Sequence, residues 1–233
     1  MSVNRVKGTG NGSVAVLTEK AAKSATPTNV AIVIPKPEMA RLAFRCVGDT
    51  PYMSNAWSAT NREQMLAKQM GKPVPKKAPK DPWLCFVETL HWVSKRPKGR
   101  PTEDDVKKAT FGIPASAFKT AAVDAIRFVD GLTMTQGKLL FFVLGELLPI
   151  TGSVQMHEGM VRLESGVADI RFRGLFPTWE VPVTVEYPPN VITGDSIVNL
   201  FQIAGQRCGV GDGRPSAPNI KNGERGRFHV EVA

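Results

Sequence analysis

Residues 181–208 read VPVTVEYPPNVITGDSIVNLFQIAGQRC, and this stretch carries the clearest fold signal in the chain. Its first seven residues alternate between apolar and polar side chains, which is typical of a half-buried β-strand. The apolar side of this predicted strand is Val181, Val183, Val185 and Tyr187. Pro182 favours an edge or a strand start. The stretch therefore begins with a strand that covers one side of a core.

A helix is predicted to follow, from about residue 194 to residue 208. Its apolar residues recur at helical spacing: Ile197, Leu200, Phe201, Ala204 and Cys208. Thr193 is placed to cap the first turn, and Gly209 is a natural stop. A strand followed closely by an amphipathic helix is half of an α+β unit.

Further elements lie on both sides of this unit. A strand at 41–47 presents Leu42, Phe44 and Cys46 on one face. The segment 114–129 has the apolar spacing of a helix, and 139–144 is a continuous apolar run that predicts a strand covered on both faces. Further strands are predicted at 168–173 and 227–232. This order predicts an α+β protein with a ferredoxin-like, RRM-like βαββαβ core.

Two regions interrupt or precede this core. Residues 1–38 have the composition of a flexible arm, and residues 39–233 are predicted to form one domain with an insertion at about 50–110. The insertion is rich in proline and strongly basic, and Lys76, Lys77 and Lys80 are candidate phosphate contacts. Its candidate stacking residues are Trp57, Trp83 and Trp92. Equally open is the alternative that the tryptophans anchor the insertion to the core.

The bulk composition favours a polyanionic partner and a reducing compartment. The formal net charge is +9, and Lys and Arg contacts to phosphates release condensed counterions. The three cysteines and three histidines are scattered, so neither a disulfide framework nor a zinc site is predicted. No apolar stretch has the length of a signal-peptide core or a membrane span. We expect no metal, no cofactor, no membrane association and a cytoplasmic location.

A glycine-rich segment lies between the second helix and the last strand. It comprises GQRCGVGDGRP at 205–215 and GERGRF at 223–228. Closely spaced glycines let backbone N–H groups approach phosphates, and four arginines add charge there: Arg207, Arg214, Arg225 and Arg227. The segment lacks the G-K-[ST] ending of a nucleotide-hydrolysing loop. The alternative is a connection whose glycines only form tight turns.

Two motifs in this order resemble the Cas7-like RAMP family, the RRM-like backbone subunits of CRISPR effector complexes. The segment GIPASAFKTAA at 112–122 resembles the I-P-G-S-S-L-K-G-A signature of that family's first helix. The glycine-rich segment before Gly226-Arg227-Phe228 resembles the family's C-terminal loop. Departures from the signature are Ala115, Ala117, Thr120 and Val123. The resemblance points to a diverged phage or mobile-element member, acting in a bacterial or phage-infected bacterial cell.

The resemblance implies subunits assembled side by side along a single strand, RNA being favoured over DNA. By the motif positions, Ser116 and Lys119 would hold phosphates, and Gly209, Gly211 and Arg214 would clasp the strand. One of the polar sheet or helix faces is predicted to line the groove, and these faces bear Arg41, Arg45, Lys119, Arg171 and Arg173. Homo-oligomers and other effector-complex subunits are the implied partners.

Catalysis is not predicted. Some relatives cut RNA with an aspartate after the first strand, and Asp49 stands at about that place. An Asp that starts a turn before Pro51 is the commoner interpretation, and no paired carboxylate or general base accompanies it. Three alternatives to a Cas7-like binding protein remain: a phage-type ssDNA-binding or annealing protein, a metal-dependent ribonuclease acting through Asp49, and a Cas7-like mimic that inhibits a larger complex.

Overall fold

Antiparallel sheets organise the part of the chain that the structure describes, which is residues 34, 36–74, 79–162, 166–218 and 222–232 of a computed structural model. Almost all of the predicted arm, as well as Lys76 and Lys77, lies outside these residues. The chain divides at Lys36, and residues 37–233 form one compact unit. This unit contains both helices and several antiparallel sheets, so the protein is of mixed α+β class. No helix within the described residues is both long and apolar enough to cross a membrane.

The larger sheet contains the three long strands that the sequence predicts at 41–47, 181–187 and 227–232. It consists of β4 (Phe142–Val143), β8 (Glu180–Tyr187), β1 (Ala40–Gly48) and β9 (Phe228–Val232), in the order β4-β8-β1-β9. All neighbours are antiparallel. Phe44 stands opposite both Val183 and Val232. The apolar alternation predicted for β1 and β8 therefore points into one core.

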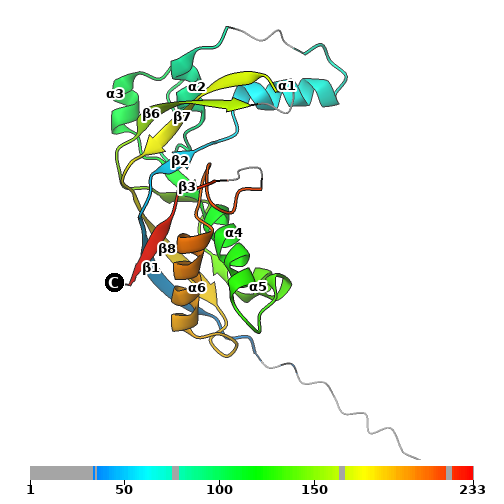
Figure 1. The fold of residues 1–233 in the computed structure, drawn as a ribbon, viewed down its shortest axis with the longest axis vertical. Coiled ribbons are helices and arrows are strands. Elements are labelled where there is room, and N and C mark those ends of the chain that lie inside the picture. The colour runs from blue at the N-terminus through cyan, green and yellow to red at the C-terminus, as the bar shows by residue number, and fades with distance from the viewer. Residues whose placement is uncertain (1–33, 35, 75–78, 163–165, 219–221, 233) are drawn as a thin grey trace, which may run out of the picture. The chain divides into compact units, whose positions relative to one another are not determined.

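Two helices cover this core face, as Figure 1 shows. They are α4 (Ala115–Ala125), continued by the 3-10 turn η1 (Ile126–Phe128), and α6 (Gly194–Arg207). Aromatic rings join the helices to the strands: the ring centroids of Phe44 and Phe201 lie 5.0 Å apart, and those of Phe118 and Phe228 lie 5.6 Å apart. Such edge-to-face pairs add to the stabilisation from apolar burial. Both helices fall where apolar spacing predicts them.

The sequence predicts only one strand of the second sheet. Its order is β2-β7-β6, with β2 (Tyr52–Ser54), β7 (Ala168–Phe176) and β6 (Gln155–Arg162). The strand predicted at 168–173 is its central member. The two-stranded pair β3 (Gly112–Pro114) and β5 (Leu147–Pro149) precedes and follows α4. The insertion itself holds three short helices, α1 (Ala59–Gln69), α2 (Pro82–Glu88) and α3 (Glu103–Lys108), and α2 packs against β7.

The strand predicted at 139–144 is wrong over its first residues. They complete the helix α5 (Met134–Leu140), and only the two residues of β4 pair with β8. Thr133 and Gln136 form a capping box at the start of α5, which satisfies the first free N–H groups of that helix. Leu139 is 75% exposed, so the apolar run is not covered on both sides. The capping box therefore favours a helix where the apolar run predicts the start of a strand.

We predict that Gly205→Ala destabilises the protein, although alanine in a helix ordinarily stabilises it relative to glycine. Gly205 lies in α6 directly beneath β9, and an added Cβ would clash with the carbonyl oxygen of Phe228. We expect a loss of about 1–3 kcal/mol, the usual cost of overpacking. Chemical denaturation measures it, with Gln206→Ala on the exposed side of α6 as the control. A stabilised Gly205→Ala variant would contradict this packing.

Candidate nucleic-acid interface

The glycine-rich loop is held against β2 by backbone hydrogen bonds. The N–H of Asp212 donates to the carbonyl of Met53 at 2.9 Å, and the N–H of Gly226 donates to the carbonyl of Pro51 at 2.9 Å. Gly211 has φ +80°, and a Cβ there would lie 2.6 Å from the Met53 oxygen. A glycine is required at this position both by the backbone conformation and by the close approach. The loop is therefore a fixed part of the fold over residues 209–218 and 222–227.

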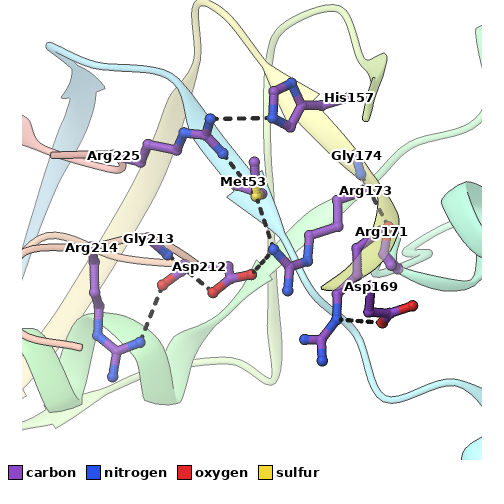
Figure 2. A network of polar contacts seen from close by, with 12 residues as sticks. Met53, His157, Asp169, Arg171, Arg173, Gly174, Asp212, Gly213, Arg214 and Arg225 are labelled. Carbon is purple, nitrogen blue, oxygen red and sulfur yellow. Dashed lines mark hydrogen bonds and ion pairs between the residues drawn. The ribbon is translucent and has the colours of Figure 1, made fainter. Parts of the chain in front are cut away.

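A cavity of about 500 Å³ opens between this loop and the β6–β7 hairpin. We call it the arginine pocket. Its lining includes Met53 of β2, His157 of β6, Arg171 and Arg173 of β7, and Asp212 and Arg225 of the loop segment. Figure 2 shows these side chains converging from three parts of the chain. Three of the lining cations are predicted from the sequence as nucleic-acid contacts: Arg171, Arg173 and Arg225.

Two of the three arginines have carboxylate partners. Nη1 of Arg173 lies 2.7 Å from Oδ2 of Asp212, and Nε of Arg171 lies 3.3 Å from Oδ2 of Asp169. Both side chains of the Arg173–Asp212 pair are less than a fifth exposed. The Asp212 oxygen has no aligned hydrogen-bond donor among the described residues, so its contact with Arg173 is an ion pair. Lys80 reaches Asp169 as well, at 2.7 Å.

Arg225 differs from the other two, because its partners are uncharged. Its guanidinium donates to Nε2 of His157 at 3.2 Å and to the sulfur of Met53 at 3.0 Å. A thioether sulfur is only a weak acceptor. No ion pair joins Arg225 to a carboxylate in the part of the chain that the structure describes. The pocket therefore holds a half-buried arginine that is ion-paired with no carboxylate of the described residues, although Asp212 and Glu224 line the same pocket.

The titration behaviour of the pocket agrees with an excess of positive charge. Burial lowers the pKa of His157 below its usual value, and the charges of Arg225 and Arg173 lower it further. The pKa of Arg173 is lowered as well, first by burial and then by Arg171 and Arg225, while Asp212 acts in the opposite direction. Neighbouring like charges disfavour protonation in this way. Both shifts oppose a further positive charge in the pocket.

A second cavity, of about 290 Å³, lies on the other side of the same loop. We call it the loop–helix pocket. Ser116 and Thr120 of α4 face Gly211 and Arg214 of the loop across it, and Asp212 lines both pockets. Pro114 gives α4 no side-chain cap. The fold therefore brings the two sequence motifs, about 90 residues apart in the chain, to one cavity.

The other cations named from the sequence lie elsewhere. On the uncovered face of the larger sheet, Arg41 pairs with Glu186 at 3.0 Å, and Arg45 pairs with Glu180 at 3.4 Å and Glu231 at 2.6 Å. These arginines are neutralised by their neighbours. The predicted groove face at Arg41 and Arg45 is thus separate from the pockets that Arg171 and Arg173 line.

Three further basic residues make local contacts. Lys119 donates to the carbonyl of Phe141 and lies 3.8 Å from the centroid of that ring, and burial lowers its pKa to about 8. The guanidinium of Arg207 stacks over Phe128 at 4.7 Å. Arg227 donates to the carbonyl of Gln206 at 3.1 Å. None of these three is among the residues that line the two pockets.

The tryptophans divide into anchors and a surface residue. Trp83 donates to the carbonyl of Pro101 and packs on Phe86, while Trp92 donates to the carbonyl of Val87. Both are partly buried against the core, as the anchoring alternative expects. Trp57 is 65% exposed and remains a stacking candidate.

Asp49 has a histidine partner. Its carboxylate lies 2.6 Å from Nδ1 of His229, so a histidine does accompany Asp49 in the fold, contrary to the expectation from the sequence. Within the described residues no group of three His, Cys, Asp or Glu side chains could hold a metal ion.

The residues that sequence reasoning missed are Met53, His157 and Asp212. A sequence signal for His157 exists, because it shares one face of the strand β6 with Gly159 and Val161. Its neighbours come from β7 and the glycine-rich loop, and no local pattern connects these segments.

Comparison with known proteins gives no family assignment. No family model matches the chain, and no curated protein shows significant similarity to it. The site must therefore be interpreted from its own chemistry.

We predict that Arg225→Gln raises the pKa of His157 in the free protein. Glutamine removes the adjacent positive charge, so protonation of the imidazole costs less. NMR titration of the histidine ring protons measures the shift. Arg227→Gln, which removes the same charge from a residue bonded to Gln206, is the control and should leave His157 unchanged. Equal shifts in both variants would mean that only the net charge matters.

Proposed function

We propose that the protein binds single-stranded nucleic acid, RNA being favoured, along the glycine-rich loop, and that it is not an enzyme. The observation that carries this proposal is the gathering of three arginines in one pocket, where Arg225 has no ion pair with a carboxylate of the described residues. A buried or half-buried charge is costly unless it meets an opposite one. A phosphate group supplies that charge and accepts hydrogen bonds from several guanidinium groups.

The placement of the two pockets favours a nucleic-acid strand, and not a small anion, as the ligand. Both pockets border the same loop and share Asp212, so an extended polyanion can occupy them in succession. In the loop–helix pocket, Arg214 and the Ser116 hydroxyl offer further phosphate contacts beside the start of α4, where the helix dipole favours negative charge. Met53, Met160 and Val161 add apolar surface to the arginine pocket. Such surface suits the non-polar faces of bases.

We further propose that the core is ferredoxin-like. In support, β1 and β4 are linked through α4, with β8 between them in antiparallel order, which is the split βαβ arrangement. Helix α6 links β8 to the outer strand β9. In contrast to an RRM, which stacks bases on the sheet, the outward arginines of β1 here are ion-paired. The bound nucleic acid is therefore proposed to run along the glycine-rich loop and not over the sheet.

The Cas7-like relationship and side-by-side assembly stay proposals. Their support is the meeting of the helix motif and the glycine-rich motif at one cavity. The ssDNA-binding alternative would use the same pockets, and the inhibitor alternative would use the same fold. Accordingly, the identity of the strand and the state of assembly need separate experiments.

Replacing two pocket arginines should weaken binding far more than replacing two arginines of the open sheet face. We predict that Arg171→Gln/Arg225→Gln lowers affinity for a labelled strand of about 30 nucleotides by roughly tenfold or more at low salt. The salt dependence should fall by about 0.7 per lost phosphate contact on a log–log plot. Fluorescence anisotropy across a salt series measures both quantities.

The matched control is Arg41→Gln/Arg45→Gln, which makes the same change of net charge on the neutralised sheet face. It should keep nearly wild-type affinity. Equal losses in the two double variants would indicate attraction by net charge alone. If the wild-type protein did not bind the labelled strand at low salt, the proposed function would be wrong.

Strand preference and assembly can be tested on the wild-type protein. We predict that an unlabelled RNA strand competes better than DNA of equal sequence, and that particle size grows with strand length. Competition anisotropy and light scattering measure these properties. Stronger competition by DNA would favour the annealing-protein alternative, and a size independent of strand length would oppose side-by-side assembly.

A further inference from the structure

His157 lies where a bound phosphate would change its charge. It stands on β6 directly opposite Arg173 of β7, and its Nε2 lies 3.2 Å from the guanidinium of Arg225. Since arginine can only donate, Nε2 is the acceptor and the imidazole is neutral in this arrangement. The charged groups that face it across the arginine pocket are Arg171, Arg173, Asp212, Glu224 and Arg225.

We propose that the arginine pocket is a proton-linked phosphate site, in which His157 takes up one proton from solvent when a phosphate group enters. The inference rests on the proposed function and adds a pH response to it. A phosphate between the arginines offers Arg225 a charged acceptor in place of Nε2. The freed Nε2 then becomes a protonated donor to the same anion, so the arrangement gains a fourth cation.

The neutral state of His157 in the empty pocket has a physical cause. Burial and the two adjacent arginines disfavour the imidazolium, and its pKa is lowered accordingly. An anion at van der Waals distance reverses the sign of the local potential and raises the pKa. Because the bound state holds the proton more tightly, affinity must rise as pH falls through the interval between the bound and free pKa values.

Proton uptake can be assigned because the chain has only three histidines, His91, His157 and His229. His229 contacts Asp49 and lines neither pocket, so it serves as the control. We expect wild-type affinity for an oligouridine strand to increase as the pH falls from 8 to 5.5, by at most about tenfold for each unit by which binding raises the pKa of His157. The increase should vanish in His157→Gln and persist in His229→Gln.

Calorimetry in buffers of different ionisation enthalpy counts the protons taken up on binding. NMR follows the His157 ring during titration with sodium sulfate, against sodium chloride at equal ionic strength. Sulfate is used because it is a tetrahedral oxyanion, like a phosphate group, and does not titrate near neutral pH. Proton uptake that depends on His157, together with a sulfate-induced rise of its pKa, is the expected result.

Several outcomes separate this inference from the proposed function. If nucleic acid binds without proton uptake, the proton-linked site is wrong and nucleic-acid binding stands. The same holds if proton uptake persists in His157→Gln. A sulfate-induced rise of the His157 pKa in a protein that binds no strand keeps the anion site and removes the proposed function. Absence of both effects removes both.

Discussion

The docking of the glycine-rich loop on β2 is the constraint on which the candidate site depends. The hydrogen bond from Asp212 to Met53 and the ion pair from Asp212 to Arg173 hold the loop between the second sheet and α4. One side of the loop then borders the arginine pocket, and the other side borders the loop–helix pocket. A loop free of β2 would leave neither cavity with a complete wall.

The insertion after β1 is integrated into the protein through its packing. Its first strand, β2, joins β7, and α2 packs against the same strand. Trp83 and Trp92 fix the remaining segments by donating hydrogen bonds to backbone carbonyls while their rings contact Phe86 and Phe111. Prolines exclude long helices there, yet short capped helices and one paired strand suffice to bury the aromatic residues.

Positive charge is distributed unevenly over the described residues. On the open face of the larger sheet, arginines alternate with glutamates across neighbouring strands, and such exposed pairs contribute little stability but cancel the local field. In the arginine pocket, Arg225 has no ion pair with a carboxylate of the described residues, and the pKa of His157 is lowered first by burial and then by Arg225 and Arg173. The net charge of +9 is therefore less informative than the place where its counter-charges are missing.

Apolar periodicity is a local property, so the sequence predicts the strands at 41–47 and 181–187, the two helices that cover them, and the last strand. Charge and glycine spacing also indicate Arg171, Arg173, Gly211, Arg214 and Arg225 as candidate contacts. The ion pairs of Arg41 and Arg45 and the anchoring contacts of Trp83 and Trp92 appear only in the folded protein, because they depend on partners brought together by folding. The helix at Leu139 differs, since the capping box that starts it is a local signal that apolar periodicity does not include. The meeting of His157, Met53 and Asp212 with Arg225 arises in the same way as those ion pairs, since a pocket between two sheets and a loop exists only once the chain has folded.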